Sequence, residues 1–269
     1  MILGAGTITY KEVYFSKAEI CIQNKIFEYY LSPILNQHNF KHAYFTKSSS
    51  EKYLKLLGNY FNENYINCVS NQYHSNVIVF GSHSEERIKA DADGLVCNKC
   101  NQNLWVYTAD CMPIFFADKR TRNVATLHCG RKGLEKKIIK NLVKIFDNLG
   151  TSRHNLLVAI GPAISKEHYL VDKMTLKEFY RKAENKNITL NLTKAEKDLC
   201  FSDSNHFKEK NLNQLDLKRS AYRQLLNENI PSTNIEISNL CTYALKNEFN
   251  SWRRSKTLSR QWNFICGQR

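Results

Sequence analysis

Residues 104–128 read LWVYTADCMPIFFADKRTRNVATLH and place three strand-like segments in a row. Each segment is a short run of apolar, aromatic or β-branched residues, and polar turn residues separate the runs. The chain then continues into a helix that opens at Gly130 and ends at Gly150, because apolar residues recur there at spacings of three or four. The expected strands are Leu104–Thr108, Pro113–Ala117 and Val124–His128.

Strands and helices are also expected on both sides of this stretch. Their mixture predicts an α/β or α+β fold. There is neither an internal repeat nor a long polar linker, so one domain is expected over residues 1–269, with the polar residues 182–191 as a surface insertion. The further strands are Val77–Phe80, Gly94–Cys97, Leu156–Ile160 and Asn234–Ser238, and the further helices are Thr175–Ala183 and Leu215–Asn227.

The composition is that of a folded protein with a substantial core. With 269 residues, 42% hydrophobic, only 10 Gly and 4 Pro, it excludes collagen-like and low-complexity chains. The most apolar stretch, Leu156–Ile164, is too short to span a bilayer, and the opening residues lack the pattern of an export signal. Nine cysteines without a regular framework indicate reduced thiols, so we expect a cytoplasmic location and no membrane association.

The net charge is strongly positive. The 39 Lys and Arg residues against 25 Asp and Glu give +14, a field that attracts nucleic acids, anionic membranes and phosphate compounds. The basic residues are spread along the chain without a block, which favours a solvated basic surface. A nucleic-acid-binding module without catalysis is therefore an alternative, although none of the usual binding motifs is present.

Three polar clusters lie at expected strand ends, where active sites commonly lie because loops vary there while the sheet holds them in place. The clusters are residues 71–74 (NQYH), 107–113 (YTADCMP) and 127–133 (LHCGRKG).

One residue from each cluster gives a His, Cys, His set. His74, Cys111 and His128 suit a catalytic zinc with its fourth position open to water or substrate. Their separations of 37 and 17 positions are not a compact finger spacing, so the spacing alone favours a buried Cys and surface His residues. A second interpretation makes Cys111 a thiolate nucleophile with His128 as its base, and with Asp110 or Gln72 to orient it or to hold an oxyanion.

Basic residues near the clusters are candidates for binding phosphate. Arg131 and Lys132 lie at the expected helix start, and Arg253 belongs to the run SWRR at residues 251–254. A helix N-terminus and a guanidinium fork both favour anions. The pair Cys97 and Cys100 has no second pair to complete a zinc ribbon, so we interpret it as structural.

Nine short motifs in sequence order resemble the YfiH, or laccase-domain purine nucleoside phosphorylase, family. The resemblance covers residues 40–265, and the TADC and HxGxxG elements are its most specific parts. The motifs are HAYFTK (42–47), QxH (72–74), ADGLV (92–96), TADCMP (108–113), HCGxxG (128–133), GPAI (161–164), DL (216–217), CT (241–242) and SWRR (251–254).

This resemblance implies a layered sandwich of mixed β-sheets flanked by helices, with zinc bound by His74, Cys111 and His128. It implies phosphorolysis of adenosine, inosine, guanosine and methylthioadenosine to base and ribose 1-phosphate, with adenosine deamination as a second activity. Zinc would lower the pKa of a bound water to about 7, as deamination requires. Phosphorolysis also needs a cation-lined pocket.

Expected roles for the remaining site residues follow from the chemistry that this reaction needs. Asp93 or Asp110 is expected to donate a proton to the purine, and Cys111 and His128 to take part in catalysis. Gln72, Arg131, Lys132 and Arg253 are expected to bind substrate or phosphate.

The chain departs from the family pattern at two places. Cys129, Arg131 and Lys132 stand where the family commonly has Ala, Trp and Arg, and residues 47–49 (KSS) replace Arg-Gly-Gly. The first change removes a stacking surface and exchanges a bidentate guanidinium for a point charge, which bears on substrate preference and rate.

Two other enzyme classes compete with this interpretation. A hydrolase of peptidoglycan precursors, the role of some relatives, would use Cys111 as ligand or nucleophile. A copper polyphenol oxidase, an older label for the family, would need several copper centres built from His-x-His pairs. The chain has 8 His and no such pair, which argues against a multicopper oxidase, and zinc remains the metal that the resemblance implies.

Overall fold

The computed structural model describes residues 10–62, 65–85, 88–97, 99, 101–183 and 212–267. Within these residues the chain forms two six-stranded sheets and one two-stranded sheet. None of the helices in this part of the chain is long and apolar enough to cross a membrane. Most of the expected insertion at residues 182–191 lies outside the described residues.

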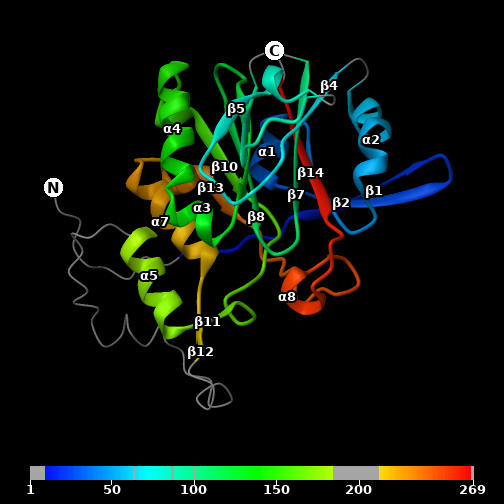
Figure 1. Ribbon diagram of the computed structural model, residues 1–269. Helices are drawn as coiled ribbons and strands as arrows, with labels where there is room; N and C mark the ends of the chain where they lie inside the picture. The colour runs from blue at the N-terminus through cyan, green and yellow to red at the C-terminus, as the bar shows by residue number, and fades with distance from the viewer. Residues whose placement is uncertain are drawn as a thin grey trace.

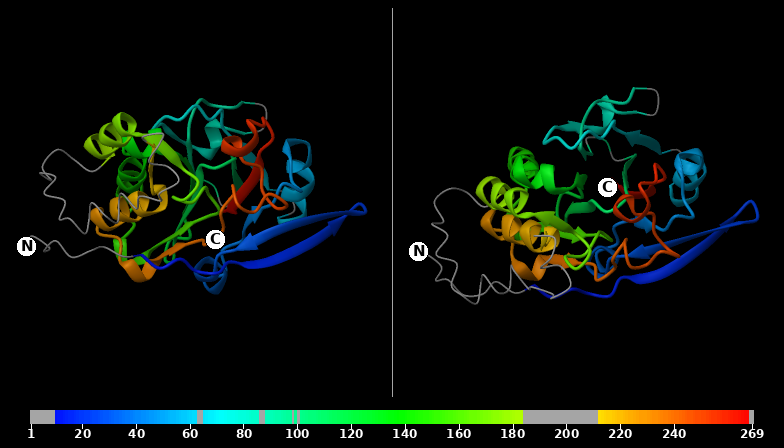
Figure 2. Two further views of the ribbon diagram at one scale, coloured as in Figure 1. Left: turned by 90° about the horizontal axis from the view of Figure 1, so that it is seen from below. Right: turned by 60° about the horizontal axis from the view of Figure 1, so that its bottom comes forward.

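The first sheet has the strand order β1-β2-β3-β14-β7-β4. Neighbouring strands are antiparallel except β4 and β7, which are parallel. The β1–β2 hairpin extends from the body of the molecule (Figure 2). The strands are β1 Ser16–Ile22, β2 Lys25–Leu31, β3 His42–Phe45, β4 Ile66–Val69, β7 Gln102–Thr108 and β14 Gln261–Cys266.

The second sheet has the order β13-β10-β8-β9-β6-β5 and is also mixed. Its outer pairs β13–β10 and β5–β6 are parallel, and the strands between them are antiparallel. Every strand expected within residues 77–97, 113–128, 156–160 and 234–238 is present here. They are β5 Ile78–Phe80, β6 Gly94–Val96, β8 Met112–Asp118, β9 Val124–Cys129, β10 Leu156–Ile160 and β13 Ile235–Ile237.

Helices cover the outer faces of the two stacked sheets, with one group beyond the second sheet and α2 beyond the first (Figure 1). The expected α/β layered sandwich is therefore confirmed. The short pair β11 Leu170–Asp172 and β12 Leu212–Gln214 lies beside α5. The helices are α1 Pro33–Gln37, α2 Leu54–Phe61, α3 Arg131–Glu135, α4 Ile138–Asn148, α5 Lys173–Ala183, α7 Leu217–Asn227 and α8 Trp252–Ser255.

Strand β8 shows why the sequence forms layers. Ile114 and Phe116 pack on the helical side, whereas Phe115 points into the core between the sheets, because successive side chains leave a strand on opposite faces. Tyr44 of β3 stacks on Phe115 with a ring-centroid distance of 4.3 Å. The Tyr44 hydroxyl donates to the carbonyl of Ala159 at 2.9 Å, which joins the two sheets through a satisfied buried group.

The expectation of one helix from Gly130 to Gly150 is wrong. Helices α3 and α4 are separated at Lys137, whose φ of 62° is left-handed, and the Lys137 ammonium donates to the carbonyl of Ala183 at the end of α5. Both helices bury apolar residues in the same core, so the spacing of those residues does not reveal the break. The helices expected over 175–183 and 215–227 are present as α5 and α7, and the Asp216 carboxylate caps α7.

Substituting Gly161 with Ala is expected to lower the free energy of unfolding by about 1–3 kcal/mol. A Cβ atom at this position would lie 2.2 Å from Cε1 of Tyr44, which cannot move because stacking and its hydrogen bond hold it. Urea denaturation measures the change. Gly133→Ala is the matched control, since its Cβ meets the nearest atom at 3.4 Å, and equal midpoints for the two variants would contradict the prediction.

Candidate active site

The three polar clusters meet where β7 of the first sheet turns into β8 of the second. His74 lies in the loop before β5, Cys111 in the turn between β7 and β8, and His128 near the end of β9. One ligand atom from each residue lies within 4.8 Å of the others, and Cys111 Sγ is 3.8 Å from His74 Nε2. The fold thus brings together residues far apart in sequence into a cluster that can hold a metal ion.

The Asp93 carboxylate holds both histidines of the cluster in position, through the ring of His128 and the backbone of His74. Its Oδ1 lies 2.7 Å from His128 Nδ1 and accepts from the His74 backbone N–H at 3.0 Å, and its Oδ2 accepts from the Ser75 N–H and hydroxyl at 2.6 and 2.7 Å. A ring nitrogen held this way leaves Nε2 of His128 for a ligand.

These contacts keep Asp93 ionised. Burial raises its pKa, but the hydrogen bonds from His128 and Ser75 outweigh burial and hold the pKa well below its ordinary value. Asp93 is fully buried, and the backbone N–H groups of Tyr73, His74 and Ser75 all donate to its carboxylate. The environment therefore suits a carboxylate that orients His128, and it does not suit the expected proton donor to a purine.

Cys111 is poised as a thiolate. Burial raises its pKa, but the adjacent His128 and His74 imidazoles outweigh burial and lower the pKa to about 6. Burial lowers the pKa of His128, but the adjacent Cys111 thiolate and Asp93 carboxylate outweigh burial and raise the pKa to about 9. A thiolate beside two imidazoles can bind a metal or act as a nucleophile, so both interpretations of Cys111 are compatible with this geometry.

Gly130 makes room for the thiolate, and Gly130→Ala is expected to weaken metal binding about tenfold or more. A Cβ atom there would lie 2.5 Å from Cys111 Sγ. Competition with a chromophoric chelator measures the affinity, and Gly133→Ala, inside the short helix α3 that Gly130 precedes, serves as the control. Unchanged affinity in Gly130→Ala with normal folding would show that Sγ is not a ligand.

Asp110 fixes the turn that carries Cys111. It adopts a φ of 92°, and its Oδ1 and Oδ2 accept hydrogen bonds from Thr242 Oγ1 at 2.8 Å and from the Arg253 N–H at 2.7 Å. Oδ1 therefore joins the turn to the segment at Thr242, and Oδ2 joins it to α8. This arrangement fits a positioning residue better than the expected proton donor.

A pocket of about 340 Å³ opens in front of the cluster. Gln72 lies in its wall, but its amide bonds to the backbone of Tyr107 at 2.7 and 2.9 Å, so Gln72 fixes the end of β7. The Arg253 guanidinium donates to the Leu170 carbonyl at 2.6 Å. The pocket is lined by Gln72, His74, Tyr107, Thr108, Ala109, Asp110, Cys111, His128, Tyr169, Trp252, Arg253 and Arg260.

The structure separates the basic residues that the sequence grouped as phosphate binders. Arg253 lines the pocket, whereas Arg131 and Lys132 do not: Arg131 pairs with Glu135 inside α3, and Lys132 is exposed. Four further residues line the pocket although no sequence pattern indicated them as substrate-binding: Tyr107, Tyr169, Trp252 and Arg260. The only signal for Trp252 was its place in the SWRR motif.

Comparison with known proteins identifies the family. Residues 51–268 match the family described as multi-copper polyphenol oxidoreductase laccase. The chain belongs to this family. Two solved structures share the fold of this laccase-family protein: YlmD from Geobacillus stearothermophilus, with a TM-score of 0.74 and 21% identity, and the hypothetical protein YfiH from Bacillus licheniformis, with 0.70 and 24%. Each alignment covers 90% of this chain and 96% of the other, and the expected resemblance to YfiH is confirmed.

Curated relatives of the laccase-family protein carry an enzyme name. A purine nucleoside phosphorylase of Synechocystis is 29% identical over 181 residues, 65% of this chain and 67% of the relative. A purine nucleoside phosphorylase of Rickettsia conorii is 34% identical over 153 residues, 54% of this chain and 61% of the relative. These relatives support an enzyme, and about a third of each lies outside the match.

Proposed function

We propose that the protein is a zinc-dependent purine nucleoside phosphorylase. The observation that carries the proposal is the convergence of His74, Cys111 and His128 at a pocket with aromatic and guanidinium walls. The names of the curated relatives agree with it. Adenosine, inosine, guanosine and methylthioadenosine are the proposed substrates, with adenosine deamination as a second activity in the same pocket.

The donor atoms fit zinc. Two imidazole nitrogens and one thiolate are a typical catalytic zinc set, with Asp93 behind His128 as the outer partner that such sites use. Among the described residues this is the single His and Cys cluster of its kind, whereas a multicopper oxidase needs several centres. When bound, zinc supplies a Lewis acid that activates water at neutral pH.

Phosphorolysis breaks the bond between ribose C1′ and the purine nitrogen and forms a bond from C1′ to a phosphate oxygen. The base leaves with the electron pair and gains a proton. The aromatic rings of Tyr107, Tyr169 and Trp252 offer faces for the purine, and the guanidinium groups of Arg253 and Arg260 offer charge for phosphate. Asp110 holds both the Cys111 turn and the Arg253 backbone, so it fixes these groups relative to each other.

Dependence on phosphate tests this function. The zinc-loaded protein is incubated with inosine with and without orthophosphate, and hypoxanthine and ribose 1-phosphate are quantified. Both products should form only when phosphate is present. Base release without phosphate would identify a hydrolase, and no base release from any of the four nucleosides would refute the proposal.

One observation favours a second candidate. The lowered pKa of Cys111 and the adjacent His128 also suit a thiolate nucleophile, and hence a hydrolase of peptidoglycan precursors. Such an enzyme would keep its activity after zinc is removed by a chelator and lose it on alkylation of Cys111. The zinc-dependent phosphorylase would lose activity on chelation and regain it when zinc is restored.

Trp252→Ala is expected to raise the KM for inosine about tenfold while kcat changes less than about twofold, because stacking contributes to binding more than to the chemical step. Trp252 is 47% exposed, whereas Trp105 and Trp262 are buried. Nucleoside should therefore quench the fluorescence of the wild type but not of Trp252→Phe. Quenching that persists in Trp252→Phe, with an unchanged KM in Trp252→Ala, would place the purine elsewhere.

A further inference from the structure

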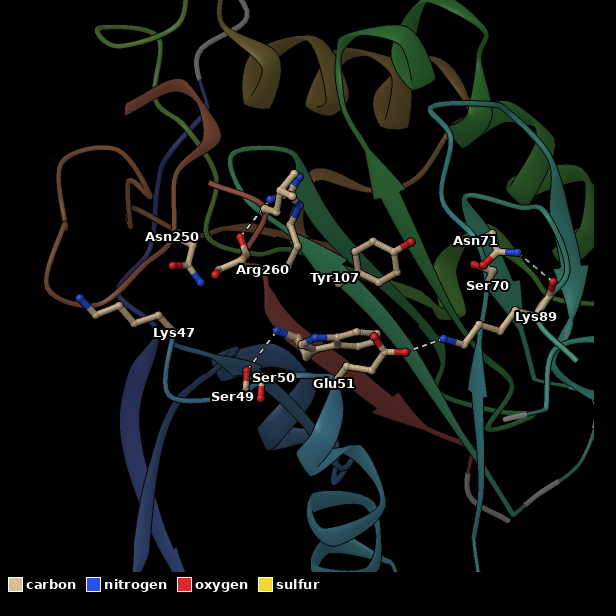
Figure 3. Close-up of a pocket in the computed structure, with 13 residues that line it drawn as sticks. Lys47, Ser49, Ser50, Glu51, Ser70, Asn71, Lys89, Tyr107, Asn250 and Arg260 are labelled. Atoms are coloured by element: carbon tan, nitrogen blue, oxygen red, sulfur yellow. Dashed lines mark hydrogen bonds and ion pairs between the residues drawn. The ribbon is translucent and has the colours of Figure 1, made fainter. Parts of the chain in front are cut away.

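A second and larger pocket adjoins the first along the same edge of the first sheet. Its volume is about 600 Å³, and it shares Tyr107 and Arg260 with the cluster pocket. Figure 3 shows Tyr107 in its wall between Arg260 and Asn71. We call it the Arg260 pocket; it is lined by Lys47, Ser49, Ser50, Glu51, Ser70, Asn71, Lys89, Tyr107, Asn250, Leu258, Ser259, Arg260 and Trp262.

The charge of the Arg260 pocket is positive. Lys89 is paired with Glu51, the one carboxylate in the lining, at 2.5 Å (Figure 3). Lys47 and Arg260 form no ion pair with any carboxylate in the described part of the chain. The positive charges of Lys47 and Arg260 therefore have no paired carboxylate among the described residues, which favours the binding of an anion in the pocket.

Arg260 is held in place for this role. Its Nη1 donates to the carbonyls of Thr257 and Ser259 at 2.7 and 3.0 Å, which fixes the guanidinium while Nε and Nη2 are not used in those bonds. Lys47 lies at the rim, where its ammonium donates to the Lys246 carbonyl at 3.0 Å and has two further N–H groups. A planar guanidinium with a nearby ammonium matches the oxygens of phosphate.

The rest of the lining is rich in hydroxyl and amide groups. Ser49 is used internally, since its hydroxyl accepts from the Trp262 N–H at 3.1 Å (Figure 3). The hydroxyls of Ser50 and Ser70 are buried at the pocket wall and have no hydrogen-bond partner among the described residues. Unpartnered buried hydroxyls are uncommon in proteins, and a polar ligand or ordered water is the usual explanation.

From these features we propose that the Arg260 pocket binds a phosphate group, next to a nucleoside in the cluster pocket. This inference rests on the proposed function and extends it, because it names phosphate-bearing nucleosides as a ligand class. Tyr107 and Arg260 line both pockets, so a phosphate carried on the ribose of a nucleoside in the cluster pocket would lie next to the Arg260 pocket, which favours a phosphate ester. Free orthophosphate has the same chemistry, and the experiment separates the two sources.

Calorimetric titration in phosphate-free buffer tests the proposal with adenosine, adenosine 5′-monophosphate and orthophosphate as probes. For an ester site, the monophosphate should bind about tenfold more tightly than adenosine, and Lys47→Met should remove most of that advantage while adenosine affinity is unchanged. For a free-phosphate site, orthophosphate should bind saturably and weaken about tenfold in Lys47→Met. Lys55→Met, on the exposed side of α2, makes the same charge change and should alter neither.

A second variant removes a hydroxyl rather than a charge. Ser70→Ala should weaken phosphate binding severalfold without lowering the urea midpoint of the ligand-free protein, because the lost hydroxyl had no partner. Thr126→Val removes another unpartnered buried hydroxyl, which lies outside the pocket, and should leave phosphate binding unchanged.

The outcomes for the pocket and for the reaction are independent. The phosphate-site proposal would be overturned, even if phosphorolysis is observed, by two results together. Adenosine and its monophosphate would bind with equal affinity, and Lys47→Met would not weaken any binding of orthophosphate. Phosphate binding that responds to Lys47→Met would support the pocket even if no base is released.

Discussion

Cys111→Ala is expected to remove the bound metal and to lower the rate of base release from inosine at least about 10³-fold. The thiolate contributes the one anionic ligand of the cluster, and two imidazoles alone leave the ion with fewer protein donors than a catalytic zinc site uses. Metal analysis of the purified variant and steady-state kinetics measure the two effects.

A matched control separates this effect from the loss of any thiol. Cys21 is exposed on the β1–β2 hairpin, so Cys21→Ala should keep the full metal content and activity. If Cys111→Ala retained both zinc and activity, the assignment of the site would be wrong. If it retained zinc but lost activity, Cys111 would be the nucleophile of the second candidate mechanism rather than a ligand.

Asp93→Asn is expected to weaken metal binding about 10–100-fold and to lower the free energy of unfolding by about 2–3 kcal/mol. The Asp93 carboxylate contacts the His128 ring nitrogen and accepts hydrogen bonds from the His74 and Ser75 N–H groups. In the Asn variant an NH2 group replaces one carboxylate oxygen and faces some of these donors. His128 then loses its fixed orientation, and buried N–H groups lose their acceptor.

Chelator competition and urea denaturation measure the two effects of Asp93→Asn. Asp172→Asn is the control, since Asp172 accepts bonds from the Thr175 N–H and hydroxyl at an exposed position and should affect neither metal affinity nor stability by much. Equal behaviour of the two variants would show that Asp93 does not orient His128.

The sequence predicted the second sheet well and the first sheet poorly. Strands β8, β9 and β10 are short apolar runs between polar turns, and a buried strand produces that pattern wherever it lies. Within the first sheet only β7 was expected. The pairing of β3 with β14 joins residues about 220 positions apart, and no local pattern indicates which strands pair over such a distance. The break at Lys137 was missed because α3 and α4 bury apolar residues in one core.

The site shows the same division. The motif resemblance identified His74, Cys111 and His128. Their convergence in space depends on the turn from β7 to β8, and the separations of these residues in sequence do not predict it. The orienting role of Asp93 depends on its contacts with two loops, and the roles of Tyr107 and Tyr169 depend on which side of the pocket their rings face. Arg131 and Lys132 were expected near phosphate because they begin a helix, yet neither lines the pocket. Arg131 pairs with Glu135 and contacts Tyr169 of the pocket wall from outside, and Lys132 is exposed.

Elemental analysis of protein purified without added metal, for the wild type and for His74→Ala, tests the central claim most directly. The account predicts about one zinc ion per chain in the wild type and less than about a tenth of that in His74→Ala, with base release lost in parallel. A wild type that releases base without zinc, or a His74→Ala protein that keeps its full zinc content, would contradict it.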